Sequence, residues 1–217
     1  MLGVACGSLG MLAGIRGGEL HAALTRFAAG DWRRRTLSGL RVTDEHGGEA
    51  VALNDVVVVR KGAGQLKTEV LVDGERYVRA AGDGVVVSTA VGSSAYGMAA
   101  GGPVLAPGLE ALVITLLSMH GGNAPSLVVP ASCPLQLVLD RGFSGRRIEV
   151  DGQPTELEGD ALELVLHPAY VTLVAFDGQE PVLAGLRRRG IVVDSPRVLA
   201  HDLRMTGERP DLPAPGR

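Results

Sequence analysis

The stretch GDGVVVSTAVGSSAYGMAAGGP, residues 82–103, is the most informative segment of the chain. It begins with a turn aspartate between two glycines, Asp83, and continues as an apolar run typical of a buried strand. A Gly-Ser-Ser loop follows, and then a short helix that Gly-Gly-Pro ends. Ser93 or Ser94 is expected to cap this helix, which would leave backbone N–H groups facing outward. From the residues alone, an ordinary capped helix is the simpler interpretation, and a ligand-binding helix start is the alternative.

Outside this segment the apolar pattern has period two, and pairs of turn residues recur between short strands. Asp-Gly pairs are among the strongest local signals of a β-hairpin, and Gly-Gly serves the same turn. Such pairs lie at Gly47-Gly48, Asp73-Gly74, Asp151-Gly152 and Asp177-Gly178. They predict a mainly β protein (α+β by count), a two-layer antiparallel β-sandwich with a few short helices. We expect the helices near residues 18–29 and 93–100, and Gly30 is expected to end the first of them. Val56–Val59 lacks alternation and is expected to be buried on both faces.

The composition of the 217-residue chain excludes several classes of protein. Lys plus Arg is 21 against 24 for Asp plus Glu, a formal net charge of −3, whereas a domain that coats nucleic acid is usually basic. Hydrophobic residues make up 46%, enough for a packed core and too many for a disordered chain. The longest apolar stretch, Leu109–Met119, is too short to cross a membrane. We therefore expect a globular protein with neither a nucleic-acid partner nor a membrane partner.

Motifs for several common chemistries are missing from the sequence. No Gly-Lys-Ser or Gly-Lys-Thr ends a phosphate-binding loop, and no Gly-x-Ser-x-Gly elbow holds a nucleophile. The five histidines form no i, i+4 pair and no cluster with cysteine, so no metal site is predicted. Cys6 and Cys133 give no disulfide framework, which favours reduced thiols in the cytoplasm. The basic triplets 33–35 and 187–189 are more typical of solvated faces than of phosphate sites.

An amide and a carboxylate stand together at Asn54 and Asp55, directly before the apolar run Val56–Val59. Vicinal hydroxyls need both hydrogen-bond donors and acceptors, so such a pair at the mouth of a strand could grip a ribose diol. An Asx turn that starts the strand is the simpler interpretation of the pair taken alone. Asp83 between its two glycines is likewise more typical of a turn than of a ligand site.

Taken in order, five segments of the chain resemble motifs of the NAD kinase family. The most specific is residues 82–103, which resembles the pattern GDGxxVSTPTGSTAYxxxAGGP. The others are Leu2–Leu12 (LGVACGSLGML), Ala52–Val56 (ALNDV), Thr115–Pro130 with His120 inside it, and Val150–Gln153 (VDGQ). Because five ordered motifs are hard to produce by chance, the resemblance raises the ligand-binding interpretation of residues 82–103 above the capped-helix one.

The resemblance implies the fold of the family's C-terminal NAD-binding domain for residues 1–205, with residues 206–217 as a flexible tail. It implies phosphoryl transfer from ATP or polyphosphate to the 2′-hydroxyl of the adenosine ribose of NAD, giving NADP. Such catalysis depends on positioning and charge neutralisation, usually with Mg²⁺ bridging phosphates. A cytoplasmic homo-oligomer, a dimer or a tetramer, is also implied. The substrate-binding residues that the resemblance implies are Asn54, Asp55, Asp83, Thr89, Ser93, Ser94, Ala95 and Tyr96, with His120 as a further candidate.

The chain also departs from the family pattern. The family's Gly-Gly-Asp-Gly motif carries the proposed catalytic base and occurs nowhere in residues 1–217, so the base is expected upstream of residue 1. Ala5, Met11 and the pair Ala90-Val91 stand where the family has other residues. Two interpretations follow: a truncated form of a longer kinase, or a relative that binds NAD or NADP without phosphorylating it. A lipid-type kinase of the wider superfamily is less favoured, because the Asn-Asp and Gly-Ser-Ser-Ala-Tyr motifs suit a dinucleotide.

Overall fold

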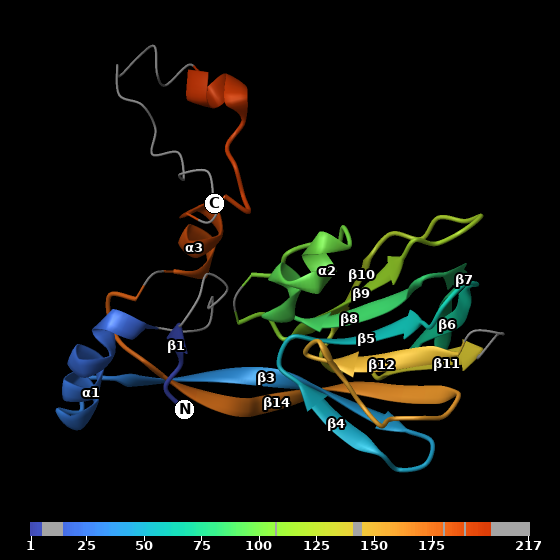
Figure 1. Ribbon diagram of the computed structural model, residues 1–217, viewed down its shortest axis with the longest axis horizontal. Coiled ribbons are helices and arrows are strands. Elements are labelled where there is room, and N and C mark those ends of the chain that lie inside the picture. The colour runs from blue at the N-terminus through green and yellow to red at the C-terminus, as the bar shows by residue number, and fades with distance from the viewer. Residues whose placement is uncertain (6–14, 107, 141–144, 180, 189, 201–217) are drawn as a thin grey trace. The chain divides into compact units, whose positions relative to one another are not determined.

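The computed structural model describes residues 1–5, 15–106, 108–140, 145–179, 181–188 and 190–200 (Figure 1). The chain divides into two compact units, Thr36–Thr172 and Met1–Arg35 together with Leu173–Arg217. Most of the glycine-rich motif expected at residues 2–12, from residue 6 onward, lies outside the described residues, as does the expected tail at 206–217. None of the described helices has the length and apolarity that crossing a bilayer requires.

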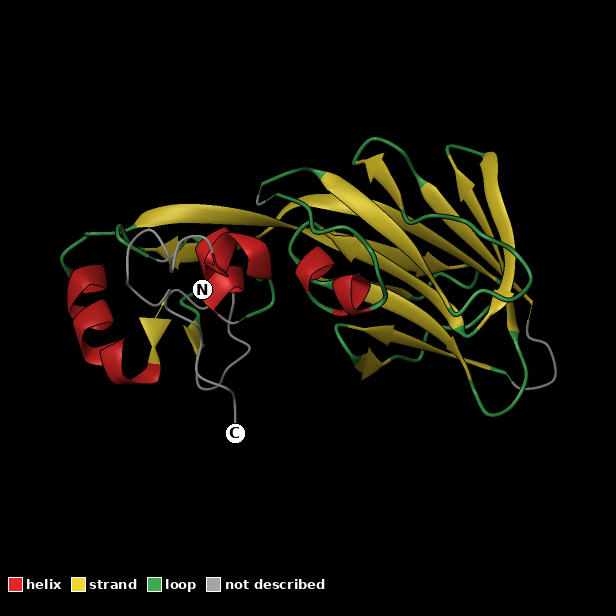
Figure 2. Cartoon of the chain, turned by 90° about the horizontal axis from the view of Figure 1, so that it is seen from above, coloured by secondary structure: helices red, strands yellow, loops and turns green. Residues whose placement is uncertain are grey.

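Two six-stranded sheets form the two layers of the β-sandwich (Figure 2). The first sheet has the order β10 (Leu127–Pro130), β9 (Ala111–Leu117), β8 (Gly84–Thr89), β5 (Asp55–Arg60), β12 (Arg146–Val150) and β13 (Gln153–Pro154). The second has the order β4 (Glu49–Ala52), β3 (Arg33–Asp44), β14 (Ala161–Ala175), β11 (Leu135–Asp140), β6 (Leu66–Val72) and β7 (Glu75–Gly82). All neighbours in the first sheet, and the pairs β4–β3, β14–β11, β11–β6 and β6–β7 of the second, are antiparallel, which confirms the predicted sandwich.

The main hydrophobic core lies between the two sheets. Val56 and Val58 of β5 face it and are fully buried, together with leucines of the opposite sheet such as Leu137 and Leu164. Val57 points the other way, into a second cluster with Val86 and Leu117, and is also fully buried. Because side chains alternate across a strand, β5 must be covered on both of its faces, as its unbroken valines predict. The outer cover includes the region of α2 (Tyr96–Ala99), which contacts β8 (Figure 1).

Three of the four predicted turns form hairpins. Gly47-Gly48 joins β3 to β4, Asp73-Gly74 joins β6 to β7, and Asp151-Gly152 joins β12 to β13. The hairpin predicted at Asp177-Gly178 is wrong, because β14 ends at Ala175 and the chain continues into α3 (Val182–Arg188). Gly178 does take the positive φ of a turn, +83°, but no strand follows it among the described residues. The dipeptide therefore marks a turn here without strand pairing behind it.

The smaller unit contains the first predicted helix, as η1 (Gly17–Glu19) followed by α1 (Leu20–Ala28). Gly30 ends it in the left-handed conformation at φ +76°, where glycine has no steric cost, as predicted. The apolar stripe of α1 is only partly covered: Ala23 is buried, whereas Leu24 and Phe27 are more than two-fifths exposed. This unit also contains the short parallel pair β1 (Val4–Ala5) and β2 (Ile15–Arg16), and α3.

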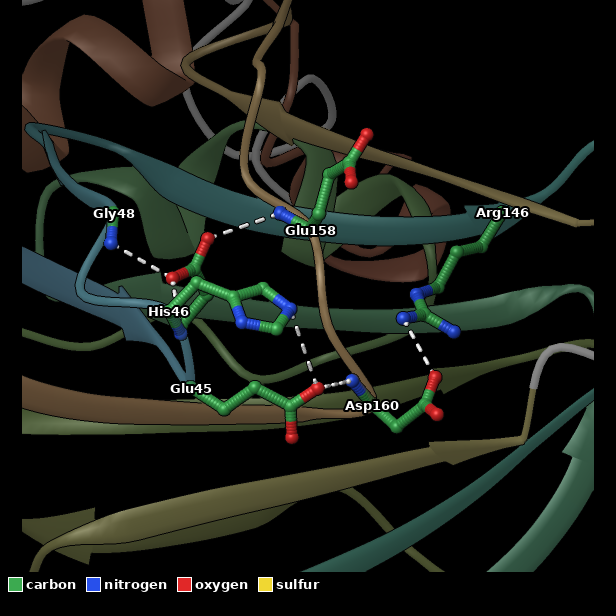
Figure 3. A network of polar contacts seen from close by, with 7 residues as sticks. Glu45, His46, Gly48, Arg146, Glu158 and Asp160 are labelled. Atoms are coloured by element: carbon green, nitrogen blue, oxygen red, sulfur yellow. Dashed lines mark hydrogen bonds and ion pairs between the residues drawn. The ribbon is translucent and has the colours of Figure 1, made fainter.

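A polar network joins the β3–β4 hairpin to the segment before β14 (Figure 3). The buried carboxylate of Asp44 accepts hydrogen bonds from the backbone N–H groups of His46 at 2.9 Å, Gly48 at 2.7 Å and Glu158 at 3.0 Å. These bonds lower the pKa of Asp44, the one from Glu158 most strongly, because they stabilise the ionised carboxylate. The network therefore fixes a loop of the larger unit through the carboxylates of Asp44 and Glu45, since Glu45 accepts the backbone N–H of Asp160 at 2.8 Å.

Candidate functional site

The Asn54-Asp55 pair lies at the connection between β4 and β5, beside the end of β8. Asp55 is the first residue of β5 and stands opposite Ser88 in the antiparallel register with β8. Because the two strands run in opposite directions, the start of β5 meets the end of β8 and the loop that follows it. The topology thus brings Asn54 and Asp55 together with residues 89–96, two segments that the sequence separates.

The loop backbone at Leu53, Asn54 and Asp55 is fully hydrogen-bonded. The Asp151 carboxylate accepts the N–H groups of all three residues, at 2.8 Å, 2.7 Å and 3.2 Å respectively. The Thr89 hydroxyl donates to the carbonyl of Leu53 at 2.6 Å, and the Thr89 N–H donates to the carbonyl of Asn54 at 2.9 Å. The Asp151 N–H donates to the carbonyl of Asp55 at 3.0 Å. Every N–H and carbonyl of this three-residue loop therefore has a partner.

The Asn54 side chain projects from this fixed loop. It is half-buried, and its amide makes no hydrogen bond to any described residue. An amide offers two N–H donors and one carbonyl acceptor, so it can bind the two hydroxyls of a ribose diol at once. The backbone of Asn54 is thus fixed, while the donors and the acceptor of its side-chain amide are unused among the described residues.

The Asp55 carboxyl lies at the same point but is 5% exposed. Its pKa is raised from an ordinary 3.8 to about 6, mainly by burial and also by the nearby charges of Asp151 and Glu149. Like charges and a low dielectric both disfavour the ionised form of a carboxyl group. Its oxygens accept no hydrogen bond from any described residue, so they remain available as acceptors.

The loop after β8 packs directly against the backbone of Asn54. A Cβ placed on Gly92 would lie 1.9 Å from the Asn54 carbonyl oxygen, so only glycine permits this approach. The segment continues as η2 (Gly92–Ser94) and then α2, and the Ala95 N–H donates to the Gly92 carbonyl at 2.8 Å. Ala95 and Tyr96 are exposed at this point. They present a small and an aromatic surface a few residues after the contact of Gly92 with Asn54.

The helix-capping prediction for Ser93 and Ser94 is wrong. The residue that precedes α2 is Ala95, and no side chain caps that helix. Both hydroxyls instead donate to carbonyls three residues back, Ser93 to Ala90 at 2.7 Å and Ser94 to Val91 at 3.1 Å. Ser93 is 1% exposed and also accepts the Leu105 N–H at 2.9 Å, so its side chain holds the loop from inside. Short polar side chains often satisfy nearby backbone groups in this way.

Thr89 is also an internal anchor. Its side chain is buried, and its hydroxyl accepts the Gly92 N–H at 3.1 Å while it donates to Leu53. The hydroxyl hydrogen is therefore already engaged inside the protein. Thr89 connects the Asn54 loop to the loop after β8, two of the segments that carry the predicted site residues.

Asp83 and His120 lie at the other end of β8. Five strand steps separate Gly84 from Thr89, about 16 Å at the usual rise per residue. Asp83 forms an ion pair with Arg60 at 2.6 Å, which is the main cause of its lowered pKa; a bond from Ser118 lowers it further. The His120 ring is hydrogen-bonded to the side chain of Gln65, and the backbone N–H of His120 donates to the carbonyl of Ala81 at 2.8 Å. Within one chain, the structure therefore divides the predicted residues into two clusters.

Asp151 is the residue of this region that the sequence analysis left out. The Asp-Gly pair predicts a turn, and a turn is what the backbone forms, with Asp151 at φ +50°. Nothing in the local sequence reveals that its carboxylate reaches a loop 97 positions away in the chain. No group of three or more His, Cys, Asp or Glu residues within the described part of the chain could hold a metal ion.

Comparison with known sequences matches residues 53–158 to the family model described as the ATP-NAD kinase C-terminal domain. The chain is 36% identical over 159 residues to an NAD kinase of Heliobacterium modesticaldum, covering 71% of this chain and 56% of that protein. It is 34% identical to one of Gemmatimonas aurantiaca, covering 82% and 64%. For one of Clostridium perfringens the identity is 30%, over 82% and 67%. The chain thus spans between about half and two thirds of the length of these relatives.

Two solved structures share the fold. A yeast NADH kinase complexed with NADH superposes with a TM-score of 0.76 at 23% identity, covering 89% of this chain and 59% of that one. An NAD kinase from Archaeoglobus fulgidus in complex with ATP gives a TM-score of 0.72 at 21% identity, covering 89% and 74%. At this level of identity the likeness establishes the architecture.

Proposed function

The chain belongs to the NAD kinase family, and on that premise we propose that it binds NAD for phosphoryl transfer to the 2′-hydroxyl of the adenosine ribose, giving NADP. ATP or polyphosphate is the proposed phosphoryl donor. The observation that carries the proposal is the junction of the Asn54 loop with residues 92–96. What supports it is an amide with unused hydrogen-bonding groups and a buried carboxyl on a loop that Thr89 and Gly92 contact, inside the region that matches the family model.

The proposed roles follow from hydrogen-bonding capacity. The Asn54 amide would bind the ribose hydroxyls as both donor and acceptor, and the Asp55 carboxyl would accept from the adenosine. Tyr96 and Ala95 would form the exposed surface next to the base and sugar. Phosphoryl transfer has a loose transition state in which the protein mainly positions the reacting groups, so a rigid ribose-binding loop contributes directly to the rate.

We assign the base and the metal ligands to no described residue of this chain. The Asp151 carboxylate already accepts three backbone N–H groups, and Asp55 is buried. The described residues do not fit a Mg²⁺ site, because no three of their His, Cys, Asp or Glu side chains converge. Magnesium is bound mainly through phosphate oxygens and water in many phosphoryl-transfer enzymes, so a donor complex could carry it.

We further propose a homo-oligomer, a dimer or a tetramer, and a cytoplasmic location. Asp83 is separated from Thr89 by nearly the whole length of β8, more than an adenosine group spans. If Asp83 contacts the same adenosine group as Asn54, a second copy of the chain is the natural source of it. Cys133 carries a free thiol, which suits a reducing compartment.

The test is an assay of NADP formation with NAD and either ATP or polyphosphate as donor, run beside calorimetric titration of NAD. NADP formation that is lost in Asn54→Ala supports the proposal. NAD binding without turnover on any phosphoryl donor, also after a relative's Gly-Gly-Asp-Gly segment is supplied, replaces it with the second candidate, a non-catalytic NAD- or NADP-binding protein. The full engagement of the Asp151 carboxylate favours that candidate, because it leaves no free exposed base beside Asn54 among the described residues. Absence of NAD binding overturns both.

A further inference from the structure

We propose that Asp151 is the positioning residue of the dinucleotide site: its carboxylate holds the loop that presents Asn54 to the ribose. This inference rests on the proposed function. Asp151 belongs to the turn between β12 and β13, and β12 pairs with β5 over five residues. The turn is therefore fixed next to the start of β5 by the sheet itself, and its carboxylate can serve as a rigid acceptor.

The geometry of the contact is specific. One Asp151 oxygen accepts the N–H of Leu53 at 2.8 Å, and the other accepts those of Asn54 at 2.7 Å and Asp55 at 3.2 Å. Hydrogen bonds to an ionised acceptor are stronger than neutral ones, so three of them on one carboxylate order a short loop effectively. The three N–H groups point the same way, as in the anion-binding nests of other loops. Here the anion is a side chain of the protein.

The other side of the loop is fixed by Thr89. With Asp151 and Thr89 in place, all six backbone polar groups of residues 53–55 are bonded, so the Asn54 side chain leaves a backbone that has little freedom to move. Removing the Asp151 carboxylate would leave three N–H groups without an acceptor. The loop would then sample other conformations, and the Asn54 amide would lose its fixed direction.

The turn at Asp73-Gly74 shows that turn formation alone does not require this contact. Its φ angles, +50° and +77°, match those of Asp151-Gly152, +50° and +75°. The Asp73 carboxylate, however, accepts no backbone N–H from the described residues. Asp73 is therefore a matched control, with the same residue type and turn geometry but without a loop to hold.

The test compares Asp151→Ala and Asp151→Asn with Asp73→Ala and Asp73→Asn in the full 217-residue chain. Amide hydrogen exchange without NAD should speed up at residues 53–55 in the Asp151 variants and stay unchanged there in the Asp73 variants. NAD affinity by calorimetry should fall about tenfold or more in Asp151→Ala and less in Asp151→Asn, which retains one acceptor oxygen. Circular dichroism identifies any variant that fails to fold, and Asp151→Asn then carries the test.

A double-mutant cycle shows whether Asp151 acts by orienting the Asn54 amide or by stabilising the whole site. In an Asn54→Ala background, Asp151→Ala should cost less than about twofold in NAD affinity, because the amide that it positions is gone. An equal loss in both backgrounds would overturn the inference, as would unchanged affinity in Asp151→Ala. If wild-type chain binds no NAD, the proposed function fails and the positioning role fails with it. Unaltered exchange at residues 53–55 would overturn the loop-anchoring claim alone, even where NAD binds.

Discussion

The Asn54 amide makes no hydrogen bond to any described residue, so its truncation should affect ligand binding more than folding. Asn54→Ala should weaken NAD binding about tenfold or more, the loss of a hydrogen bond worth about 1–3 kcal/mol. Calorimetric titration measures the loss, and a denaturant curve checks that the fold is intact. Gln136→Ala, on β11 of the other sheet, is the control. Equal affinities of wild type and Asn54→Ala would remove Asn54 from the site.

Asp55 should make stability depend on pH. Its pKa is raised from 3.8 to about 6, so the folded chain holds this proton more tightly than the unfolded chain does. The resulting stability is fully present below about pH 4 and is lost as pH rises through about 6. Asp55→Asn cannot ionise. Its free energy of unfolding should therefore rise relative to that of the wild type by about 1–2 kcal/mol over this interval, allowing for solvent screening.

Urea unfolding at several pH values between 4 and 7 measures this effect. Asp73→Asn lies at an exposed turn and is the control: its free energy of unfolding should change with pH in the same way as that of the wild type. If the free energy of unfolding of Asp55→Asn also changes with pH as that of the wild type does, the account of Asp55 is wrong.

Gly92 should tolerate no side chain. A methyl group there would lie 1.9 Å from the Asn54 carbonyl oxygen, and the backbone on one side would have to move. Gly92→Ala should therefore destabilise the chain by about 1–3 kcal/mol, the range for overpacking a rigid site. Gly18→Ala is the control, since a Cβ at Gly18 meets nothing within 4 Å. Indistinguishable denaturant midpoints for the two variants would contradict the close approach.

At the scale of single residues, the sequence indicates which residues are candidates for the site, but not which atoms their side chains contact. The pair Asn54-Asp55 can be found from its position before a strand, and Gly92 from its Gly-Ser-Ser context. The inward-facing roles of Thr89 and Ser93 cannot, because a hydroxyl that binds a ligand and one that binds a carbonyl look alike in a sequence. Long-range partners such as Asp151 require the register of the sheet.

At the scale of elements, carboxylates of the β3–β4 hairpin accept backbone N–H groups of the segment before β14: Asp44 from Glu158, and Glu45 from Asp160 (Figure 3). The pKa of Asp44 is lowered, so its contribution to stability is present above its unfolded value of 3.8 and is lost as pH falls below that value. Asp44→Asn should be less stable than the wild type at neutral pH, and the gap should close under acid conditions. Thermal unfolding across this pH range measures it; a gap that persists at low pH would show that the charge is not the cause.

The hairpins of the larger unit were predictable, because Gly47-Gly48, Asp73-Gly74 and Asp151-Gly152 each lie between strands that pair locally. Asp177-Gly178 misleads because the same dipeptide also ends a strand without starting another. How far other elements bury the apolar face of α1 could not be predicted either. A helical stripe shows which face is apolar, but burial depends on which elements reach it.

At the scale of the whole molecule, the two clusters at the ends of β8 predict that sites are shared between copies. Asp83→Ala and Asn54→Ala should each weaken NAD binding when assayed alone. Mixed after unfolding and refolding together, they should recover part of the tight binding, because some assemblies then combine an intact Asn54 with an intact Asp83 from another copy. No recovery on mixing, or a monomer by sedimentation, would contradict the shared site.

The order of motifs along the chain made the family and the two-layer fold predictable, whereas the separation of Asp83 from Asn54 was not. Both lie in segments that resemble ligand-binding motifs, and only the antiparallel register of β5 and β8 places them at opposite strand ends. The proposed assembly would bring the two ends of β8 from different copies together, which the sequence of one chain does not show.

The most direct measurement is a titration of ¹⁵N-labelled chain with NAD, followed through its backbone amide resonances. The account predicts progressive shifts centred on Asn54, Asp55 and the amides of residues 92–96, while strands of the opposite sheet such as β11 remain unchanged. Binding that leaves the Asn54 loop unperturbed and shifts resonances elsewhere would contradict it.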